Sequence, residues 1–280
     1  MTERLELPAR GMVFDALADG PAGGEPVLLL HGFPQTPACW SGVLAALGSA
    51  GYRAVAPAQR GYSPRARPAG RHAYRMPELI ADVLAMAEQL GAGRFHLAGH
   101  DWGGAVAWAL AARHPERVRT LTAVSTPHPR AMARSLAGTQ LLRSSYIPLF
   151  RVPRLAERML GAGGGRGLRT MLTTSGLDPA TADTYVAAMQ APGALTAALN
   201  WYRGALPFGV APRVTVTVPA LYVWGDRDQA LGPRAARTTG RWVTAPYRFE
   251  VIAGGGHWIP EQHADRLSAW MLERLDRGGW

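Results

Sequence analysis

Asp101 lies at the centre of the pattern Gly99-His100-Asp101-Trp102-Gly103. The apolar residues 95–98 before it predict a buried strand, and the Ala-rich residues 105–113 after it predict a buried helix. The glycines on both sides suit a tight turn in which the two backbones pass close together. A carboxylate of ordinary pKa, about 3.9, is ionised at neutral pH, so Asp101 can attack carbon without a base to activate it. That chemistry suits strained ethers and carbon–halogen bonds better than esters or amides.

Asp228 and His257 are the residues expected to assist this nucleophile. Asp228 follows the predicted strand 221–224, and His257 follows three glycines after a strand that ends at Ile252. Open α/β sheets place their sites at these carboxyl ends of strands. The chain order nucleophile, acid, histidine is typical of enzymes whose nucleophile stands on a strand–turn–helix elbow. We therefore expect His257 to deprotonate a water and Asp228 to orient its imidazole.

Both assignments have alternatives within the same loops. Asp226 is a second candidate for the acid, and a turn or helix-capping role is the alternative for His257. Some enzymes of this type carry the acid after the preceding strand. Here that position is occupied by residues 125–127, which contain no carboxylate.

An oxyanion hole is the third part of the predicted site. The motif His31-Gly32-Phe33-Pro34 follows the predicted strand 27–30. In the elbow arrangement, this loop supplies one backbone N–H group and the residue after the nucleophile supplies the other. We assign these donors to Phe33 and Trp102. An ordinary strand-to-helix turn is the alternative interpretation of the motif.

Strand and helix patterns alternate along most of the chain. The expected strands are residues 12–17, 27–30, 53–56, 95–98, 120–124, 220–224 and 249–252, and the expected helices are 76–90, 105–113 and 261–275. Such alternation predicts an α/β fold with a mostly parallel sheet covered by helices.

The alternation is interrupted between residues 128 and 213, where the patterns indicate helices and loops without a clear strand. We expect a helical cap at 128–213, inserted into an α/β core formed by residues 1–127 and 214–280. The Gly-rich residues 161–167 predict a mobile loop within the cap.

Composition and charge set limits on the partners of this chain. With 280 residues it can bury a sizeable core, and 48% hydrophobic and 18% charged residues are typical of a globular protein. Residues 1–24 contain no apolar signal-peptide core, and no apolar run is long enough to span a membrane, so we expect a cytoplasmic protein. The only cysteine, Cys39, excludes an internal disulfide and disfavours a cysteine-based metal site.

The net charge of +10 comes entirely from arginine, since all 30 basic residues are arginine. A genome rich in G and C explains this usage, and no nucleic-acid-binding motif is present, so we expect no nucleic-acid partner. Residues 128–213 contain ten arginines against three acidic residues, a net charge of +7. This excess could concentrate anionic substrates at the cap, or it could simply form a solvated face.

Four motifs carry a family resemblance that covers nearly the whole chain. They are His31-Gly32-Phe33-Pro34, Arg60-Gly61-Tyr62-Ser63, Gly99-His100-Asp101-Trp102-Gly103-Gly104 and Asn200-Trp201-Tyr202-Arg203. On these motifs the chain resembles the α/β-hydrolase-fold epoxide hydrolases, which are related to haloalkane dehalogenases. The resemblance implies that Tyr202 donates a hydrogen bond to the epoxide oxygen from the cap. It implies the same for Tyr146, which begins a short aromatic stretch. Simple packing of the cap core is the alternative for both tyrosines.

The activity that this resemblance implies is conversion of an epoxide and water to a vicinal diol. Asp101 would form an alkyl ester, and His257 with Asp228 would activate the water that hydrolyses it. The implied partners are a small-molecule epoxide and water, without a cofactor, metal or membrane; a homodimer is left open. We expect four residues to line the substrate pocket: Phe33, Trp102, Trp201 and Trp258.

Two positions depart from the family pattern. The family commonly has an acidic residue where Gln35 stands, and another where Ala58 stands. Neither position takes part chemically in the implied mechanism, so these departures concern loop geometry and pocket shape.

Two other functions compete with the implied one. A dehalogenase would share the Asp nucleophile but would have no use for paired cap tyrosines. Its fluoroacetate-type relatives carry arginine where Trp102 stands. A non-catalytic small-molecule receptor would typically lack part of the catalytic set, which is complete here.

Overall fold

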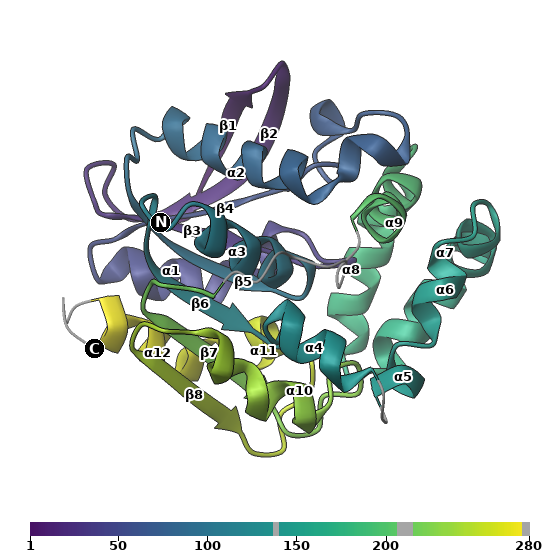
Figure 1. The fold of residues 1–280 in the computed structure, drawn as a ribbon. Coiled ribbons are helices and arrows are strands. Elements are labelled where there is room, and N and C mark those ends of the chain that lie inside the picture. The colour runs from purple at the N-terminus through teal and green to yellow at the C-terminus, as the bar shows by residue number, and fades with distance from the viewer. Residues whose placement is uncertain (137–139, 206–214, 276–280) are drawn as a thin grey trace.

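One eight-stranded sheet forms the centre of the computed structural model, which describes residues 1–136, 140–205 and 215–275 (Figure 1). The strand order is β1-β2-β4-β3-β5-β6-β7-β8. The strands are β1 (Glu3–Ala9), β2 (Met12–Asp19), β3 (Pro26–Leu30), β4 (Arg53–Pro57), β5 (Phe95–His100), β6 (Val118–Val124), β7 (Ala220–Gly225) and β8 (Tyr247–Ile252). Only β2 pairs antiparallel with its neighbours, which are β1 and β4. The predicted α/β fold with a mostly parallel sheet is therefore confirmed.

Helices cover both faces of this sheet. The helices α1 (Ser41–Ser49) and α12 (Ala264–Leu275) contact each other, as do α2 (Met76–Gln89) and α3 (Trp102–Arg113) on the opposite face (Figure 1). The predicted final helix is divided into α11 (Ile259–Gln262) and α12. The short helix α10 (Pro233–Thr238) lies between β7 and β8.

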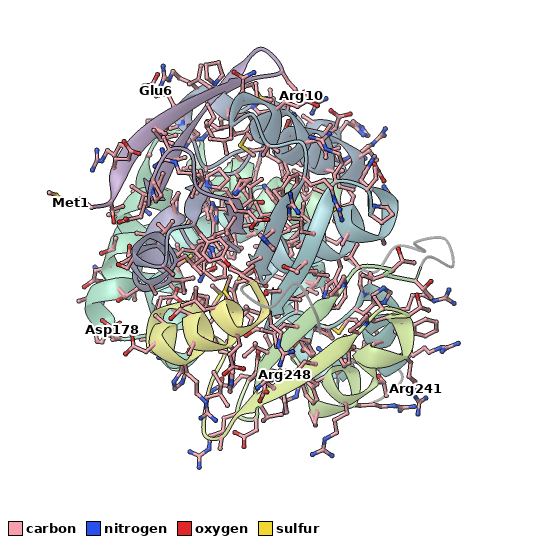
Figure 2. The ribbon with its side chains drawn as sticks, turned by 90° about the vertical axis from the view of Figure 1, so that its left-hand side faces the viewer. Met1, Glu6, Arg10, Asp178, Arg241 and Arg248 are labelled. Atoms are coloured by element: carbon pink, nitrogen blue, oxygen red, sulfur yellow. The ribbon has the colours of Figure 1, made fainter. Side chains whose placement is uncertain are left out.

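Charged side chains surround this layered core. Glu6, Asp178 and Arg241, three of the residues labelled in Figure 2, lie on the outside of the ribbon and are exposed. Within the described ranges, no helix is both long enough and apolar enough to cross a membrane.

Among the described residues, six helices lie between β6 and β7. They are α4 (Pro129–Ser135), α5 (Gln140–Arg143), α6 (Tyr146–Phe150), α7 (Leu155–Thr174), α8 (Pro179–Gln190) and α9 (Ala194–Gly204). We propose that they form the predicted cap, whose end at residue 213 lies outside the described residues. Figure 1 shows α5 to α9 grouped beside the core, past the ends of the strands.

The Gly-rich segment interrupts α7, as its composition predicts. Residues 162–165 leave the helical conformation, so two helical pieces that share the label α7 meet at a break there. Gly163, Gly164 and Gly165 all have positive φ, which glycine adopts without steric cost. The loop is therefore present but shorter than the predicted range 161–167, and its mobility stays a prediction.

A buried ion pair in the core holds the loop residue that contacts helix α9. Arg60, in the loop after β4, donates from Nε and Nη2 to the two carboxylate oxygens of Asp82 on α2, at 2.5 and 2.6 Å. Both residues are almost fully buried. The carbonyl oxygen of Arg60 accepts a hydrogen bond from the indole N–H of Trp201 at 2.8 Å. The position of α9 therefore depends on this ion pair.

We predict that Asp82→Ala lowers the free energy of unfolding by about 3–5 kcal/mol, because it leaves the buried Arg60 guanidinium uncompensated. Urea denaturation followed by circular dichroism measures this loss. The matched control is Asp183→Ala, which breaks the exposed pair between Asp183 and Arg169 and should hardly move the midpoint. Equal midpoint shifts in the two variants would contradict the prediction.

Candidate active site

Asp101 occupies the turn between β5 and α3, as its flanking pattern predicts. Its backbone has φ +51° and ψ −120°, a conformation that costs energy for a residue with a side chain. A Cβ atom on Gly99 would lie 2.3 Å from the carbonyl oxygen of Gly103, and one on Gly103 would lie 2.2 Å from that of Leu30. Both glycines are therefore required by the close approach of strand, turn and helix.

Two backbone N–H groups hold the carboxylate of Asp101. The N–H of Phe33 donates to Oδ1 at 2.8 Å, and the N–H of Trp102 provides a second hydrogen bond. Burial raises the pKa of Asp101, while the nearby His257 and these two N–H groups oppose the rise. The predicted oxyanion-hole donors thus already contact the carboxylate of the nucleophile.

His257 lies between two carboxylates. Its Nδ1 is 2.9 Å from Oδ2 of Asp228, and its Nε2 is 3.8 Å from Oδ2 of Asp101. The side chain of Asp228 is fully buried, and its Oδ1 accepts hydrogen bonds from the backbone N–H groups of Ala230 and Leu231. Asp228 is thereby fixed in the position from which it can orient the imidazole.

Asp226, the alternative acid, has a different contact. Its Oδ1 accepts a hydrogen bond from the backbone N–H of Gly254 at 2.8 Å, and the residue is exposed. The structure therefore places Asp228 against His257, and Asp226 against the glycine turn that precedes it.

Opposing influences set the protonation of His257. Burial disfavours the charged imidazolium, but the charge and hydrogen bond of Asp228, followed by the charges of Asp101 and Glu261, outweigh it. The net result raises the pKa of His257 to about 9. The imidazole is therefore protonated at neutral pH as long as Asp101 is ionised.

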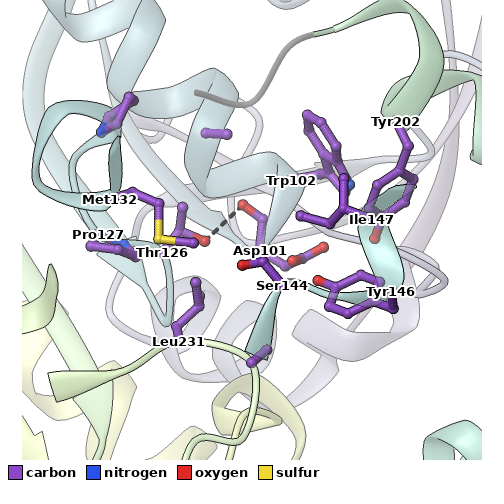
Figure 3. A pocket seen from close by; sticks show the side chains of 13 residues that line it. Asp101, Trp102, Thr126, Pro127, Met132, Ser144, Tyr146, Ile147, Tyr202 and Leu231 are labelled. Atoms are coloured by element: carbon purple, nitrogen blue, oxygen red, sulfur yellow. Dashed lines mark hydrogen bonds between the residues drawn. The ribbon is translucent and has the colours of Figure 1, made fainter. Parts of the chain in front are cut away.

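Tyr146 and Tyr202 come from separate cap helices and lie on the same side of Asp101 (Figure 3). Their ring centroids are 6.3 Å apart, and Tyr202 also packs edge-on against Trp102 and Phe33. Burial, reinforced by the charge of Asp101, raises the pKa of both phenols above the ordinary value. Both hydroxyl groups therefore remain protonated and able to donate.

Two cavities meet at Asp101. One, of about 250 Å³, is lined by Phe33, Tyr146, Tyr202, His257 and Trp258 among others. The second is lined by Trp102 together with residues that follow β6 and β7, as Figure 3 shows. The structure thus brings together three of the four predicted pocket residues.

Trp201 is the predicted pocket residue that the structure places elsewhere. It lines neither cavity at Asp101 but a small one beside Arg60, Asp82 and Met86. Its ring packs behind Trp102, with the centroids 5.9 Å apart. Trp201 therefore supports the site from behind.

Ser125 and Thr126, which follow β6, were not predicted from the sequence to belong to the site. The hydroxyl of Thr126 donates to the carbonyl oxygen of Asp101 at 2.8 Å, and that of Ser125 donates to the carbonyl oxygen of His257 at 2.9 Å. Their position at the carboxyl end of a strand was the signal that could have identified them.

Known proteins resemble this chain along nearly its whole length. Residues 25–264 match the family described as the alpha/beta hydrolase fold. The AB hydrolase superfamily protein YfhM of Bacillus subtilis (strain 168) is 34% identical over 276 residues, covering 95% of both chains. Epoxide hydrolase A of Mycobacterium tuberculosis is 30% identical, covering 98% of this chain and 97% of the relative. The chain belongs to the α/β-hydrolase-fold epoxide hydrolase family.

A solved structure from this family has the same arrangement. It is described as one of the novel epoxide hydrolases in metagenomes from hot environments. It superimposes with a TM-score of 0.86 at 29% identity and covers 98% of both chains. The cap helices are included in this coverage, so the likeness is not confined to the sheet.

We predict that Asp228→Asn lowers the pKa of His257 from about 9 by about one unit or more, because the variant loses the negative charge that favours the imidazolium. Titration of the imidazole by NMR measures the shift. Asp226→Asn is the matched control, since Asp226 bonds the backbone of Gly254, and it should leave the pKa nearly unchanged. A larger shift in the control would assign the acid to Asp226.

Proposed function

We propose that this protein is an epoxide hydrolase that converts a small-molecule epoxide and water into a vicinal diol. One observation supports this above the others: a buried carboxylate and two protonated tyrosines lie around one cavity of about 250 Å³. A nucleophile and proton donors so placed can act on the carbon and the oxygen of the same strained ring. We further propose a cytoplasmic enzyme, and a homodimer is the oligomer to test.

In the first step, Asp101 opens the epoxide. The oxygen Oδ2 attacks a ring carbon, and the bond between that carbon and the ring oxygen breaks. The electron pair stays on the ring oxygen, where Tyr146 and Tyr202 stabilise it by hydrogen bonding and supply a proton. The product is a hydroxyalkyl ester of Asp101.

In the second step, His257 activates water. Esterification removes the negative charge of Asp101, so the pKa of His257 falls from about 9. The imidazolium then releases its proton through solvent to the tyrosinate left by the first step, and the neutral imidazole can act as a base. Water attacks Cγ of the ester while the N–H groups of Phe33 and Trp102 hold the negative charge on Oδ1. The ester bond then breaks, and the departing oxygen takes the proton that His257 removed from water, which releases the diol. The carboxylic acid left on Asp101 passes its proton to His257, which restores the carboxylate and the imidazolium.

The tyrosine pair favours epoxide opening over halide displacement. An epoxide oxygen remains attached to the product and needs a proton, which a phenol can supply, whereas a halide leaves as a solvated anion. The complete set of Asp101, His257 and Asp228 also supports catalysis over simple ligand binding.

We predict that in a single turnover in oxygen-18 water, the label enters Asp101 before it enters the diol, because water attacks the ester carbonyl. Mass spectrometry of the peptide that contains Asp101 and of the diol measures both. Asp101→Asn is expected to lose diol formation, since an amide is a poor nucleophile. Label that enters the diol directly in the first turnover would mean that water attacks the epoxide without an ester.

We predict that Tyr202→Phe and Tyr146→Phe each lower kcat by about a hundredfold, because each removes one donor to the developing oxyanion. Steady-state kinetics on an epoxide panel measures the change, with smaller effects expected on KM. Tyr74→Phe is the control, since that buried hydroxyl donates to the carbonyl oxygen of Pro68. An equal loss of kcat in the control would remove the special role of the cap tyrosines.

A further inference from the structure

Glu261 is a buried carboxylate that takes no part in the two steps above. It lies in α11, four residues after His257. Its Oε1 accepts hydrogen bonds from Nε2 of Gln35 at 2.7 Å and from the hydroxyl of Tyr185 at 2.8 Å. Burial of an ion is costly, so a carboxylate kept in this place calls for a reason.

Gln35 connects Glu261 to the loop after β3. Its side chain is fully buried, and its Oε1 accepts a hydrogen bond from the backbone N–H of Gly32 at 2.8 Å. The same oxygen lies 2.8 Å from Nδ1 of His100. The amide therefore contacts one loop, one strand and one helix that all end at the site.

Glu261 and the N–H of Gly32 together decide which way the amide of Gln35 faces. A carboxylate only accepts hydrogen bonds, so it selects the orientation in which Nε2 of Gln35 faces it. In the reversed orientation, the amide oxygen would face the carboxylate and the amide nitrogen would face the N–H of Gly32. Both contacts would then be repulsive.

The orientation of this amide matters at two points of the site. Gly32 precedes Phe33, whose N–H binds the carboxylate of Asp101. His100 precedes Asp101 in the chain, and its Nε2 lies 2.9 Å from the carbonyl oxygen of His257. Both the oxyanion-hole loop and the backbone of the catalytic histidine therefore contact groups that Gln35 aligns.

We propose that Glu261 is a positioning residue that acts through Gln35, and that this pair carries on Glu261 the negative charge expected at position 35. The loop after β3 has Gln35 where the family commonly has an acidic residue, and Nε2 of Gln35 donates to the carboxylate of Glu261 at 2.7 Å. Gln35 donates and Glu261 accepts in this pair, so the carboxylate stands on α11 instead of on the loop after β3. The kinetic measurements that test this proposal rest on the proposed epoxide hydrolase function.

Four proteins test the exchange: wild type, Glu261→Gln, Gln35→Glu and the double variant. In Glu261→Gln, two amides can pair in either direction, so position 261 no longer selects the orientation of Gln35 and only the N–H of Gly32 still favours it. In Gln35→Glu, two carboxylates about 2.7 Å apart must share a proton. In the double variant, the carboxylate at position 35 accepts from Gly32 and His100 while the amide at position 261 donates to it, which restores a single orientation.

We expect each single variant to lower kcat by about five- to tenfold with little change in KM, and the double variant to recover to within about threefold of wild type. Rates of ester hydrolysis in single turnovers locate the loss, since that step uses the N–H of Phe33. The proposal would be overturned if the kcat of the double variant, relative to wild type, did not exceed the product of the relative kcat values of the two single variants.

Tyr185→Phe separates positioning from stability. It removes the other hydrogen bond to Glu261 and leaves Gln35 in place. We expect a lower melting temperature in thermal unfolding but kcat within about twofold of wild type. If this variant lost as much kcat as Glu261→Gln, the carboxylate would serve the fold alone and the proposal would fail.

NMR of protein labelled with [15N]histidine provides a readout that is independent of activity. Nδ1 of His100 faces the oxygen of Gln35 and its Nε2 faces the carbonyl oxygen of His257, so the two acceptors compete for the single proton of the neutral ring. With the amide of Gln35 held in one orientation, we expect the Nδ1-protonated tautomer to be populated in the wild type. Glu261→Gln should populate the Nε2-protonated tautomer, and the double variant should return to the first. Unchanged His100 resonances in Glu261→Gln would refute the proposal. A wild type that opens no epoxide would refute only the proposed function.

Discussion

The site depends on one largely buried anion, the carboxylate of Asp101, held in a strained turn. Burial of an unpaired carboxylate costs several kcal/mol and would protonate it, which would end its use as a nucleophile. The N–H groups of Phe33 and Trp102 and the imidazolium of His257 offset that cost. Since these three groups come from separate segments of the chain, the fold must bring three loops to the carboxyl edge of the sheet before the nucleophile can exist in its active form.

The same charge orders the reaction. While Asp101 is ionised, it helps to keep His257 protonated and raises the pKa of Tyr146 and Tyr202, so the donors hold their protons. When the ester forms, the charge disappears and the imidazole becomes a better base. The histidine is therefore a poor base before the ester exists and a competent one afterwards. In the proposed mechanism, the charge of Asp101 thus links the two steps, while Asp228 remains the larger influence on the pKa of His257.

The sheet could be predicted from the sequence, and so could the three residues against the carboxylate of Asp101, which are Phe33, Trp102 and His257. Parallel strands end at one edge of the sheet, and the sequence motifs mark those ends. It misplaced Trp201, because adjacent residues of a helix point about 100° apart and only Tyr202 of the pair faces the cavity. It missed β1, an edge strand whose outward positions are charged. The network of Gln35 and Glu261 joins residues that are 226 positions apart, so no local pattern could reveal it.

The two cap tyrosines are positioned by different forces. Tyr202 follows Trp201, whose indole is hydrogen-bonded to the carbonyl of Arg60, and Arg60 is paired with the buried Asp82. Tyr146 begins a five-residue helix and packs against the rings of Phe150 and Tyr202. Hydrogen bonds fix direction, whereas ring packing tolerates small shifts. In the proposed mechanism, Tyr202 is therefore the donor with a fixed relation to Asp101, and Tyr146 is the one that can adjust to the shape of the epoxide.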